Sequence, residues 1–169
     1  SKNVEVHLKM VANDITESIF FDKMHKMGGI VEEFLEGEIK MSPSVQCVIG
    51  PNKVIDIVST HDQLLGGNDN QVYQGAIFPA NMQYNITLAA QGKIIAQILA
   101  DKGALGRFAI DFISVLQSDG SWKHYAIEIN LRKGGTTHPL LMLQFLTDGK
   151  YNSETGEYLT ASRHKRFYF

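Results

Sequence analysis

Polar groups of three chemical types follow one another on a strand that is otherwise apolar. In YAIEINLRKGG, residues 125–135, apolar side chains alternate with a second set that includes Glu128, Asn130 and Arg132. Alternation with a period of two is typical of a β-strand whose two faces meet different surroundings. The spacing therefore places a carboxylate, an amide and a guanidinium on one face of a strand over 122–131.

A tight turn brings a second acid to this face. Asp119-Gly120 is a strong hairpin signal between the alternating runs 107–116 and 122–131. A symmetric turn of even length centred on this dipeptide places Asp111 directly across from Glu128. Two further pairs follow on the same face: Ala109 with Asn130, and Arg107 with Arg132.

The facing acids suggest a metal site. Like charges directly opposite in a sheet repel by something within the ~0.2–1 kcal/mol scale of cross-strand pairs, and burial would force one acid to keep its proton. A divalent cation removes the conflict, and the oxygens of Asp111, Glu128 and Asn130 suit Mg²⁺ or Mn²⁺. In the alternative interpretation both acids point to solvent and the arginines pair with them. A register error of one residue would also destroy the pairing, so spacing alone leaves both interpretations open.

Bulk composition limits the class of protein. The 169 residues suffice for one domain, and a hydrophobic content of 44% with 20% charged residues is ordinary for a globular protein. A net charge of −2 without a basic block disfavours nucleic-acid binding, and no apolar run is long enough for a membrane span. The single cysteine, Cys47, has no internal partner, which suits a reducing cytoplasm. We expect it to be a core residue in a strand.

Periodicity predicts the elements that must position these residues. The helix at 14–27 has Asp14 and Glu17 in its first turn and a stop at Gly28, with a core face of Phe20, Met24 and Met27. Strands mixed with separate helices indicate an α+β domain, with a mainly antiparallel sheet flanked by helices. The other expected elements are strands at 4–10, 30–35, 38–49, 53–60, 107–116 and 122–131, a turn at 50–52, strand plus turn at 73–80, helices at 82–101 and from Pro139 to near Gly149, and a C-terminal hairpin with ETGEY as its turn and HKRFYF as its last strand.

FAIDF, followed by IEIN and then Arg132, resembles the C-terminal lobe of the ATP-grasp ligases. The longer string EINLRKGGTTHP is more specifically similar to the ATP-grasp ligases of pheganomycin-type peptide biosynthesis, and the resemblance runs from about residue 28 to the end. It implies that Asp111, Glu128 and Asn130 hold the magnesium ions that bridge the phosphates of ATP. It also implies that Arg132 steadies an acyl phosphate or its tetrahedral successor.

The resemblance implies a nucleotide-binding hinge at IVEEFLEGE. Glu32 and the backbone of Glu33, Phe34 and Leu35 would meet the edge of the adenine, and Glu38 would bind the ribose hydroxyls. The alternative is a solvated acidic edge strand, which is what so many glutamates in a short stretch usually form.

Two other motifs carry weaker signals. GGTTHP could bind an anion at a helix N-terminus, or it could be an ordinary helix start, and the roles of Thr136, Thr137 and His138 stay open. THD at 60–62 contains the His-Asp pair of a metal phosphohydrolase, but the further histidines of that motif are missing, so we interpret it as a coincidence.

Nothing before Gly28 resembles the glycine-rich flap and the phosphate-binding lysines of a complete ATP-grasp enzyme. We therefore expect residues 1–169 to be a single domain, the C-terminal lobe of a longer protein, inactive alone. The parent is expected to be an ATP-dependent carboxylate–amine ligase that works through an acyl phosphate with Mg-ATP. Its partners would be a small-molecule carboxylate and an amine, such as an amino acid or peptide, and its oligomeric state is left open. The alternative is a catalytically incompetent binding or assembly module of the same ancestry.

Overall fold

The computed structural model describes residues 15–67 and 72–169. Its contacts divide the chain into two compact units, Ser1–Leu35 with Gly66–Val72, and Glu36–Leu65 with Tyr73–Phe169. The strand expected at 4–10 lies outside the described residues, and the single domain expected for 1–169 stays a prediction.

The first unit contains helix α1, Glu17–Met27. Its N-cap is Thr16, whose hydroxyl accepts a hydrogen bond from the main-chain N–H three residues later. The helix ends as expected at Gly28, which has a φ of 73°. The predicted helix is therefore confirmed with a shorter N-terminal end, and Asp14 falls outside the described part of the chain.

Two other expectations for this region are wrong. No residue of α1 is buried, and Met27, one of the three residues expected to face a core, is 81% exposed. Residues 30–35 form no strand, and most of their side chains are exposed. Apolar residues at helical or alternating spacing indicate a possible buried face, but they do not supply the surface that would bury it.

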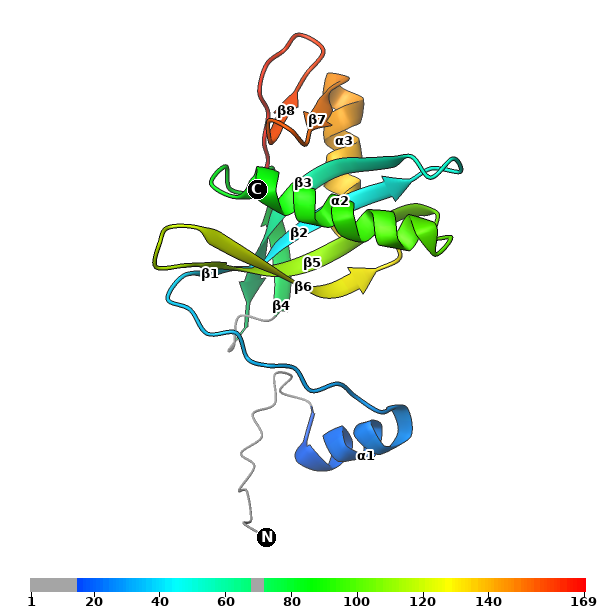
Figure 1. The fold of residues 1–169 in the computed structure, drawn as a ribbon, viewed down its shortest axis with the longest axis vertical. Coiled ribbons are helices and arrows are strands. Elements are labelled where there is room, and N and C mark those ends of the chain that lie inside the picture. The colour runs from blue at the N-terminus through cyan, green and yellow to red at the C-terminus, as the bar shows by residue number, and fades with distance from the viewer. Residues whose placement is uncertain (1–14, 68–71) are drawn as a thin grey trace. The chain divides into compact units, whose positions relative to one another are not determined.

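The second unit is built on an antiparallel sheet with the order β1-β5-β2-β3-β4, and β6 pairs with the other edge of β5 (Figure 1). The expected antiparallel α+β architecture is confirmed. Strands β1 and β2 lie along one edge of β5 as two pieces of the strand expected at 38–49. The bounds are β1 Lys40–Met41, β2 Pro43–Ile49, β3 Ile55–Gly66, β4 Val72–Ile77, β5 Gly106–Leu116, β6 Trp122–Asn130, β7 Lys150–Asn152, β8 Glu157–Leu159, α2 Asn85–Asp101 and α3 Thr137–Thr147.

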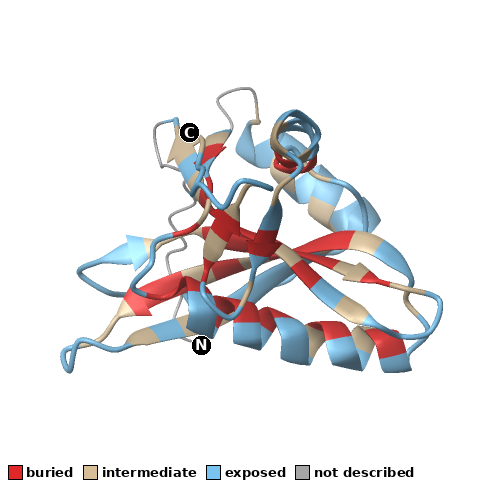
Figure 2. Cartoon of the chain, turned by 90° about the horizontal axis from the view of Figure 1, so that it is seen from above, coloured by how far each residue is buried: buried red, intermediate tan, exposed pale blue. Residues whose placement is uncertain are grey.

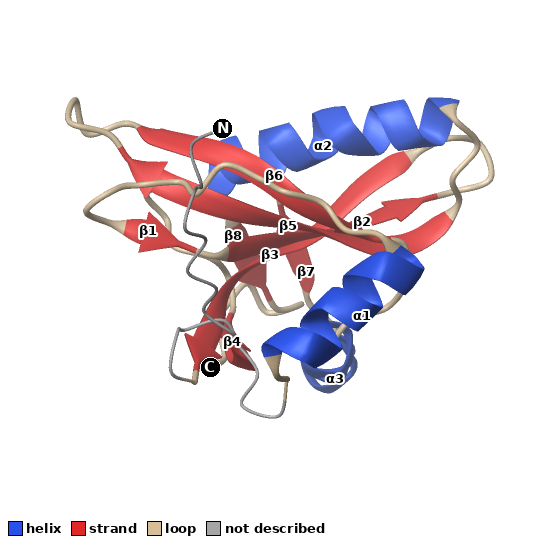
Figure 3. Cartoon of the chain, turned by 90° about the horizontal axis from the view of Figure 1, so that it is seen from below, coloured by secondary structure: helices blue, strands red, loops and turns tan. Residues whose placement is uncertain are grey.

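Helix α2 covers one face of the sheet (Figure 3). Gly92 allows this packing, because a Cβ atom there would lie 2.7 Å from Cγ1 of Val45 on β2. Figure 2 shows buried residues along the central strands and the inner side of α2. Cys47 is fully buried here, as expected for a core residue, and burial raises the pKa of its thiol to about 12.

The C-terminal part follows α3, which begins two residues before Pro139 and ends at Thr147; its C-cap, Asp148, has a left-handed conformation. Strands β7 and β8 form a hairpin as expected, but its turn is shorter than ETGEY, because Glu157 and Tyr158 already belong to β8. The last strand expected at HKRFYF is not regular. Instead, Lys165 and Tyr168 each form an isolated bridge, to Leu159 and Phe78 respectively. No helix among the described residues is both long and apolar enough to cross a bilayer.

Candidate metal and nucleotide site

The β5–β6 hairpin places the two acids as predicted. Asp111 lies directly across from Glu128, and Ala109 lies across from Asn130. The third predicted pair does not form, because β6 ends at Asn130 and the chain turns so that the N–H of Arg132 donates to the Asn130 carbonyl at 2.7 Å.

The turn that sets the register of β5 and β6 differs from the expected one. The turn has an odd number of residues: the N–H of Gln117 donates to the carbonyl of Ser121, and Gly120 takes the left-handed conformation, with a φ of 82°. Such a three-residue loop pairs Phe112 with Ala126. A β-bulge at the next step then leaves one residue of β6 unpaired.

The bulge decides which face carries the acids. The pairing moves from Phe112–Ala126 to Asp111–Glu128, which skips Ile127. Without the bulge, Asp111 would pair with Ile127, and Glu128 would point to the opposite face of the sheet. The bulge therefore corrects the shift that the odd turn introduces.

Asp111 is the centre of a network of polar side chains. It is half-buried, and its Oδ2 accepts a hydrogen bond of 3.1 Å from Nδ2 of Asn130. The side chain of Ser44, which lies across from Asp111 on β2, and that of Gln63 on β3 also form hydrogen bonds to this carboxylate. Four strands, β2, β3, β5 and β6, thus contribute to one polar position.

Burial raises the pKa of Asp111, and the negative charge of Glu128 raises it further. The hydrogen bonds from Ser44 and Gln63 and the positive charge of Arg132 act in the opposite direction, without cancelling the rise. A nearby cation would stabilise the ionised form of this carboxyl group, because a positive charge favours the carboxylate.

The donor set fits a hard divalent cation. Asp111 and Glu128 offer carboxylate oxygens, and Asn130 keeps its amide oxygen available because its Nδ2 serves the hydrogen bond to Asp111. No group of three or more His, Cys, Asp or Glu side chains in the described ranges could hold a metal. Two carboxylates and an amide match the sparse protein ligation of Mg²⁺, which takes its remaining oxygens from phosphate and water.

The loop that leads into α3 is anchored by a buried glutamine. Gln46 on β2 donates to the hydroxyl of Thr136, and its Oε1 accepts from Thr137 at 3.3 Å and from Nη1 of Arg107 at 3.3 Å. Both threonine hydroxyls are therefore used inside the protein, which favours a structural helix start over an anion site. His138 is exposed.

Tyr73 on β4 packs against this loop. A Cβ atom at Gly135 would lie 3.2 Å from Cε1 of the Tyr73 ring, so the ring lies over the glycine backbone. Burial raises the pKa of the Tyr73 phenol, and the charge of Asp111 adds to the rise, so the phenol lies within the electrostatic range of the acid. Sequence reasoning missed Tyr73.

Sequence reasoning also missed the polar residues of β2. Ser44 and Gln46 occupy alternate positions in PSVQCVI, an otherwise largely apolar strand, and both are buried. Polar residues two apart in a buried strand must find partners on one face. This signal was available in the sequence.

The residues proposed to bind the nucleotide are divided between the two units. Glu32, Glu33, Phe34 and Leu35 belong to the first unit and lie in irregular chain, so the expected hinge strand is not formed. Glu38 belongs to the second unit and is exposed in a bend just before β1. Nucleotide binding by these five residues stays a prediction.

Known proteins are similar to this chain in sequence and in fold. The family model for IQCH-like, ATP-grasp domains matches residues 6–154. The L-propargylglycine–L-glutamate ligase of Streptantibioticus cattleyicolor is 32% identical over 135 residues, which are 80% of this chain and 26% of that protein. This chain therefore spans about a quarter of the curated relative it matches.

Two solved structures show the same fold. N5-carboxyaminoimidazole synthetase from Staphylococcus aureus, complexed with ADP, superposes with a TM-score of 0.50 and 19% identity, covering 74% of this chain and 30% of that one. An ADP complex of N5-carboxyaminoimidazole ribonucleotide synthetase gives a TM-score of 0.50 and 18% identity, covering 84% and 34% respectively. The family model covers most of the chain and confirms the resemblance to ATP-grasp ligases. The chain therefore belongs to the ATP-grasp family.

Proposed function

We propose that the protein containing this chain is an ATP-dependent carboxylate–amine ligase, and that this chain binds the metal and part of the nucleotide. The observation that carries the proposal is the acid pair: the half-buried Asp111 and the exposed Glu128 lie across from each other beside Asn130, in a chain of the ATP-grasp family. The name of the curated relative, a ligase of two amino acids, supports an amino acid or peptide as substrate.

In the proposed reaction a carboxylate oxygen attacks the γ-phosphorus of ATP, ADP leaves, and an acyl phosphate forms. An amine then attacks the acyl carbon, the tetrahedral adduct expels phosphate and loses a proton from the attacking nitrogen to solvent, and an amide remains. A bound divalent cation would neutralise phosphate charge and orient the transferred group. The protein's own contribution is positioning and charge complementarity.

Each site residue has a proposed role. Asp111 and Glu128 would hold the cation and Asn130 would add its amide oxygen, while the 3.1 Å hydrogen bond from Asn130 Nδ2 orients the Asp111 carboxylate. Arg132 is exposed at the end of β6, where its planar guanidinium can bind the oxygens of the acyl phosphate or the tetrahedral adduct. Glu32 to Leu35 and Glu38 are proposed to contact the adenine and the ribose.

The proposal is tested on the full-length protein by thermal unfolding with Mg-ATP. A ligand at about 100 times its Kd raises the free energy of unfolding by about 2.7 kcal/mol, which raises Tm. We expect this magnesium-dependent shift in the wild type and its loss in Asp111→Asn and Glu128→Gln. Asp56→Asn is the matched control, because it removes an exposed carboxylate from the same sheet. Absence of a magnesium-dependent shift in folded wild-type protein contradicts the proposal.

Arg132→Gln separates binding from chemistry. This variant should keep the Mg-ATP shift but lower ADP release with pooled amino acids and peptides by about 10²-fold, the scale for losing one donor to a developing oxyanion. In the alternative, a binding module without catalysis, the wild type releases no ADP and Glu128→Gln leaves partner binding intact.

A further inference from the structure

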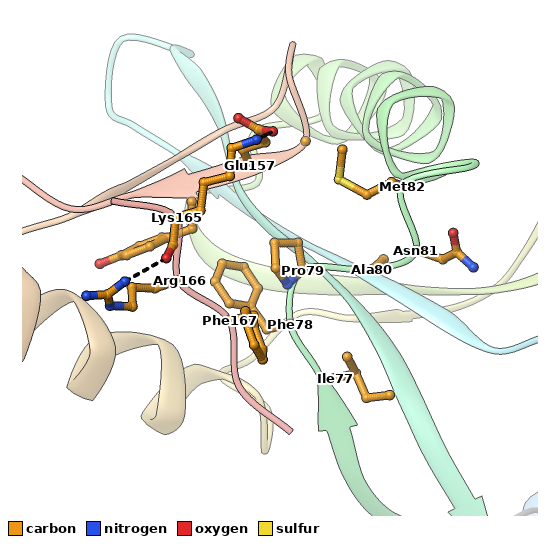
Figure 4. Close-up of a pocket in the computed structure, with 12 residues that line it drawn as sticks. Ile77, Phe78, Pro79, Ala80, Asn81, Met82, Glu157, Lys165, Arg166 and Phe167 are labelled. Carbon is orange, nitrogen blue, oxygen red and sulfur yellow. Dashed lines mark hydrogen bonds and ion pairs between the residues drawn. The ribbon is translucent and has the colours of Figure 1, made fainter. Parts of the chain in front are cut away.

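One residue of the C-terminal tail, residues 161–169, is not exposed. Tyr168 is half-buried, whereas every other side chain from 161 to 169 is exposed. Phe78 and Tyr168 exchange two main-chain hydrogen bonds, of 2.8 and 3.0 Å, and their rings stack with centroids 5.1 Å apart. Figure 4 shows the tail beside the segment 77–82, which contains Phe78. The bridge and the stack together fix the position of the Tyr168 side chain.

The phenol of Tyr168 links β3 to the loop that follows the metal site. Its hydroxyl lies 2.7 Å from Nε2 of His61 on β3, and it donates to the main-chain carbonyl of Thr136 at 3.5 Å. Thr136 ends the loop 132–136, which runs from Arg132, after β6, to the start of α3. We infer that Tyr168 is a positioning residue of the ligase site, which holds this loop through the Thr136 carbonyl.

The protonation of His61 gives the link its direction. Burial keeps the imidazole neutral, so it carries one N–H. With the proton on Nε2, His61 donates to the Tyr168 oxygen, and the phenol proton is free for the Thr136 carbonyl. With the proton on Nδ1, the phenol donates to His61 instead, and the Nδ1–H has no partner among the described residues. The first arrangement makes two hydrogen bonds and leaves no buried donor unpaired, so it is favoured.

Tyr168 completes a set of three contacts on one short stretch of the loop. Gln46 on β2 donates to the hydroxyl of Thr136, and the ring of Tyr73 on β4 lies over Gly135. Tyr168 adds a hydrogen bond to the main chain of Thr136 from the tail. Two strands and the tail therefore hold residues 135 and 136 from three separate parts of the chain.

This arrangement restricts Arg132, because only Lys133 and Gly134 separate it from the held residues. The guanidinium of Arg132 is itself exposed, so its position depends on the backbone that carries it. Small displacements of a catalytic group lower the rate even where substrate binding is kept. The inference rests on the proposed function, since it assigns the tail a role in placing Arg132 for the reaction.

The first test measures hydrogen exchange in the full-length protein, by mass spectrometry of peptides that span residues 132–137. In Tyr168→Phe the ring can still stack on Phe78 and the main-chain bridge can form, so the hydroxyl alone is lost. We expect the loop amides to exchange up to about tenfold faster in this variant, the scale of one hydrogen bond. The unfolding curve checks that the variant is folded.

The second test measures ADP release from Mg-ATP with pooled amino acids and peptides. In Tyr168→Phe we expect kcat to fall about tenfold, the scale of one lost positioning contact. The KM for ATP and the Mg-ATP thermal shift should not change, because the loop carries Arg132 and not the acid pair. A purely structural role would lower Tm and leave kcat as it is.

Tyr151→Phe is the matched control. It removes the hydroxyl of another enclosed tyrosine beside Phe78, but this hydroxyl lies 2.9 Å from Oγ1 of Thr60, on β3. The control variant should lower Tm and leave both the loop exchange and kcat unchanged. Equal effects of the two variants on either readout, or no effect of Tyr168→Phe, would overturn the inference. A wild type that releases no ADP contradicts the ligase proposal instead, and the exchange comparison then decides by itself whether the tail holds the loop.

Discussion

At the scale of single residues, His61 shows most directly what burial does to a titratable group. It is fully buried on β3, and its Nε2 lies 2.7 Å from the hydroxyl of Tyr168. Its Nδ1 has no hydrogen-bond partner among the described residues. Burial lowers the pKa of His61 from 6.5 to about 3, so folding holds this imidazole neutral.

This makes the stability of the fold depend on pH. Between pH 6.5 and about 3 the unfolded chain binds a proton at His61 and the folded chain does not, so the free energy of unfolding falls as the pH falls through this window. We predict a loss of about 2 kcal/mol from this residue between about pH 6.5 and pH 5.

Urea unfolding at several pH values checks the effect. In His61→Gln the dependence on pH should be flatter by about one proton over this window. His25→Gln, which replaces an exposed histidine of α1, controls for the loss of an imidazole in general. Parallel stability curves for wild type and His61→Gln would refute the prediction.

Residue types and spacing were enough to predict that Asp111, Glu128 and Asn130 lie close together, because each lies on one of two strands joined by a short turn. They were not enough to find Gln63 and Tyr73, whose strands reach Asp111 only through the order of the whole sheet. Contacts between neighbouring strands in the chain can be predicted from sequence. Contacts that depend on tertiary packing cannot.

At the scale of elements, the predicted pairing of β5 with β6 was correct, but the turn predicted to produce it was not the one observed. The expected turn was even and the observed one is odd, but the bulge at Ile127 restores the pairing of Asp111 with Glu128. Neither departure could be predicted from the alternation of side chains, since Tyr125, Ile127 and Ile129 look equivalent in the sequence. Bulges are often found beside functional sites, where they redirect side chains.

From the packing of α2 on β2 we predict how the mutation Gly92→Ala changes the stability of the fold. The mutation would place a methyl group 2.7 Å from Cγ1 of Val45, a stiff β-branched side chain. Overpacking costs about 1–3 kcal/mol, while replacing a helical glycine by alanine gains about 1 kcal/mol. We predict a net destabilisation of up to about 2 kcal/mol, measured by urea unfolding.

A double-mutant cycle identifies the cause. In the Val45→Ala background the methyl group has room, so Gly92→Ala should be neutral or stabilising there. Gln91→Ala, an exposed neighbour on α2, should change the free energy of unfolding by less than about 0.5 kcal/mol. An equal cost of Gly92→Ala in both backgrounds would show that the contact with Val45 is not responsible.

At the scale of the whole molecule, we expect the proposed reaction to need more residues than this chain supplies. The site offers the acid pair Asp111 and Glu128, with Asn130 beside them, and Arg132 at the end of β6. ATP carries several negative charges on its phosphates, and phosphoryl transfer depends on groups that surround them. The chain spans 26% of its curated relative, so we expect further phosphate-binding groups to come from other parts of the full-length protein.

The 169-residue chain purified alone should show a cooperative unfolding transition, since its second unit has a continuous buried core. It should release no ADP above background from Mg-ATP and pooled amino acids, whereas the full-length protein should release it steadily. Preorganised phosphate contacts contribute several kcal/mol to such reactions, and a site without them loses turnover before it loses its fold. ADP release by the isolated chain that stops in Asp111→Asn would show instead that these residues form a complete active site.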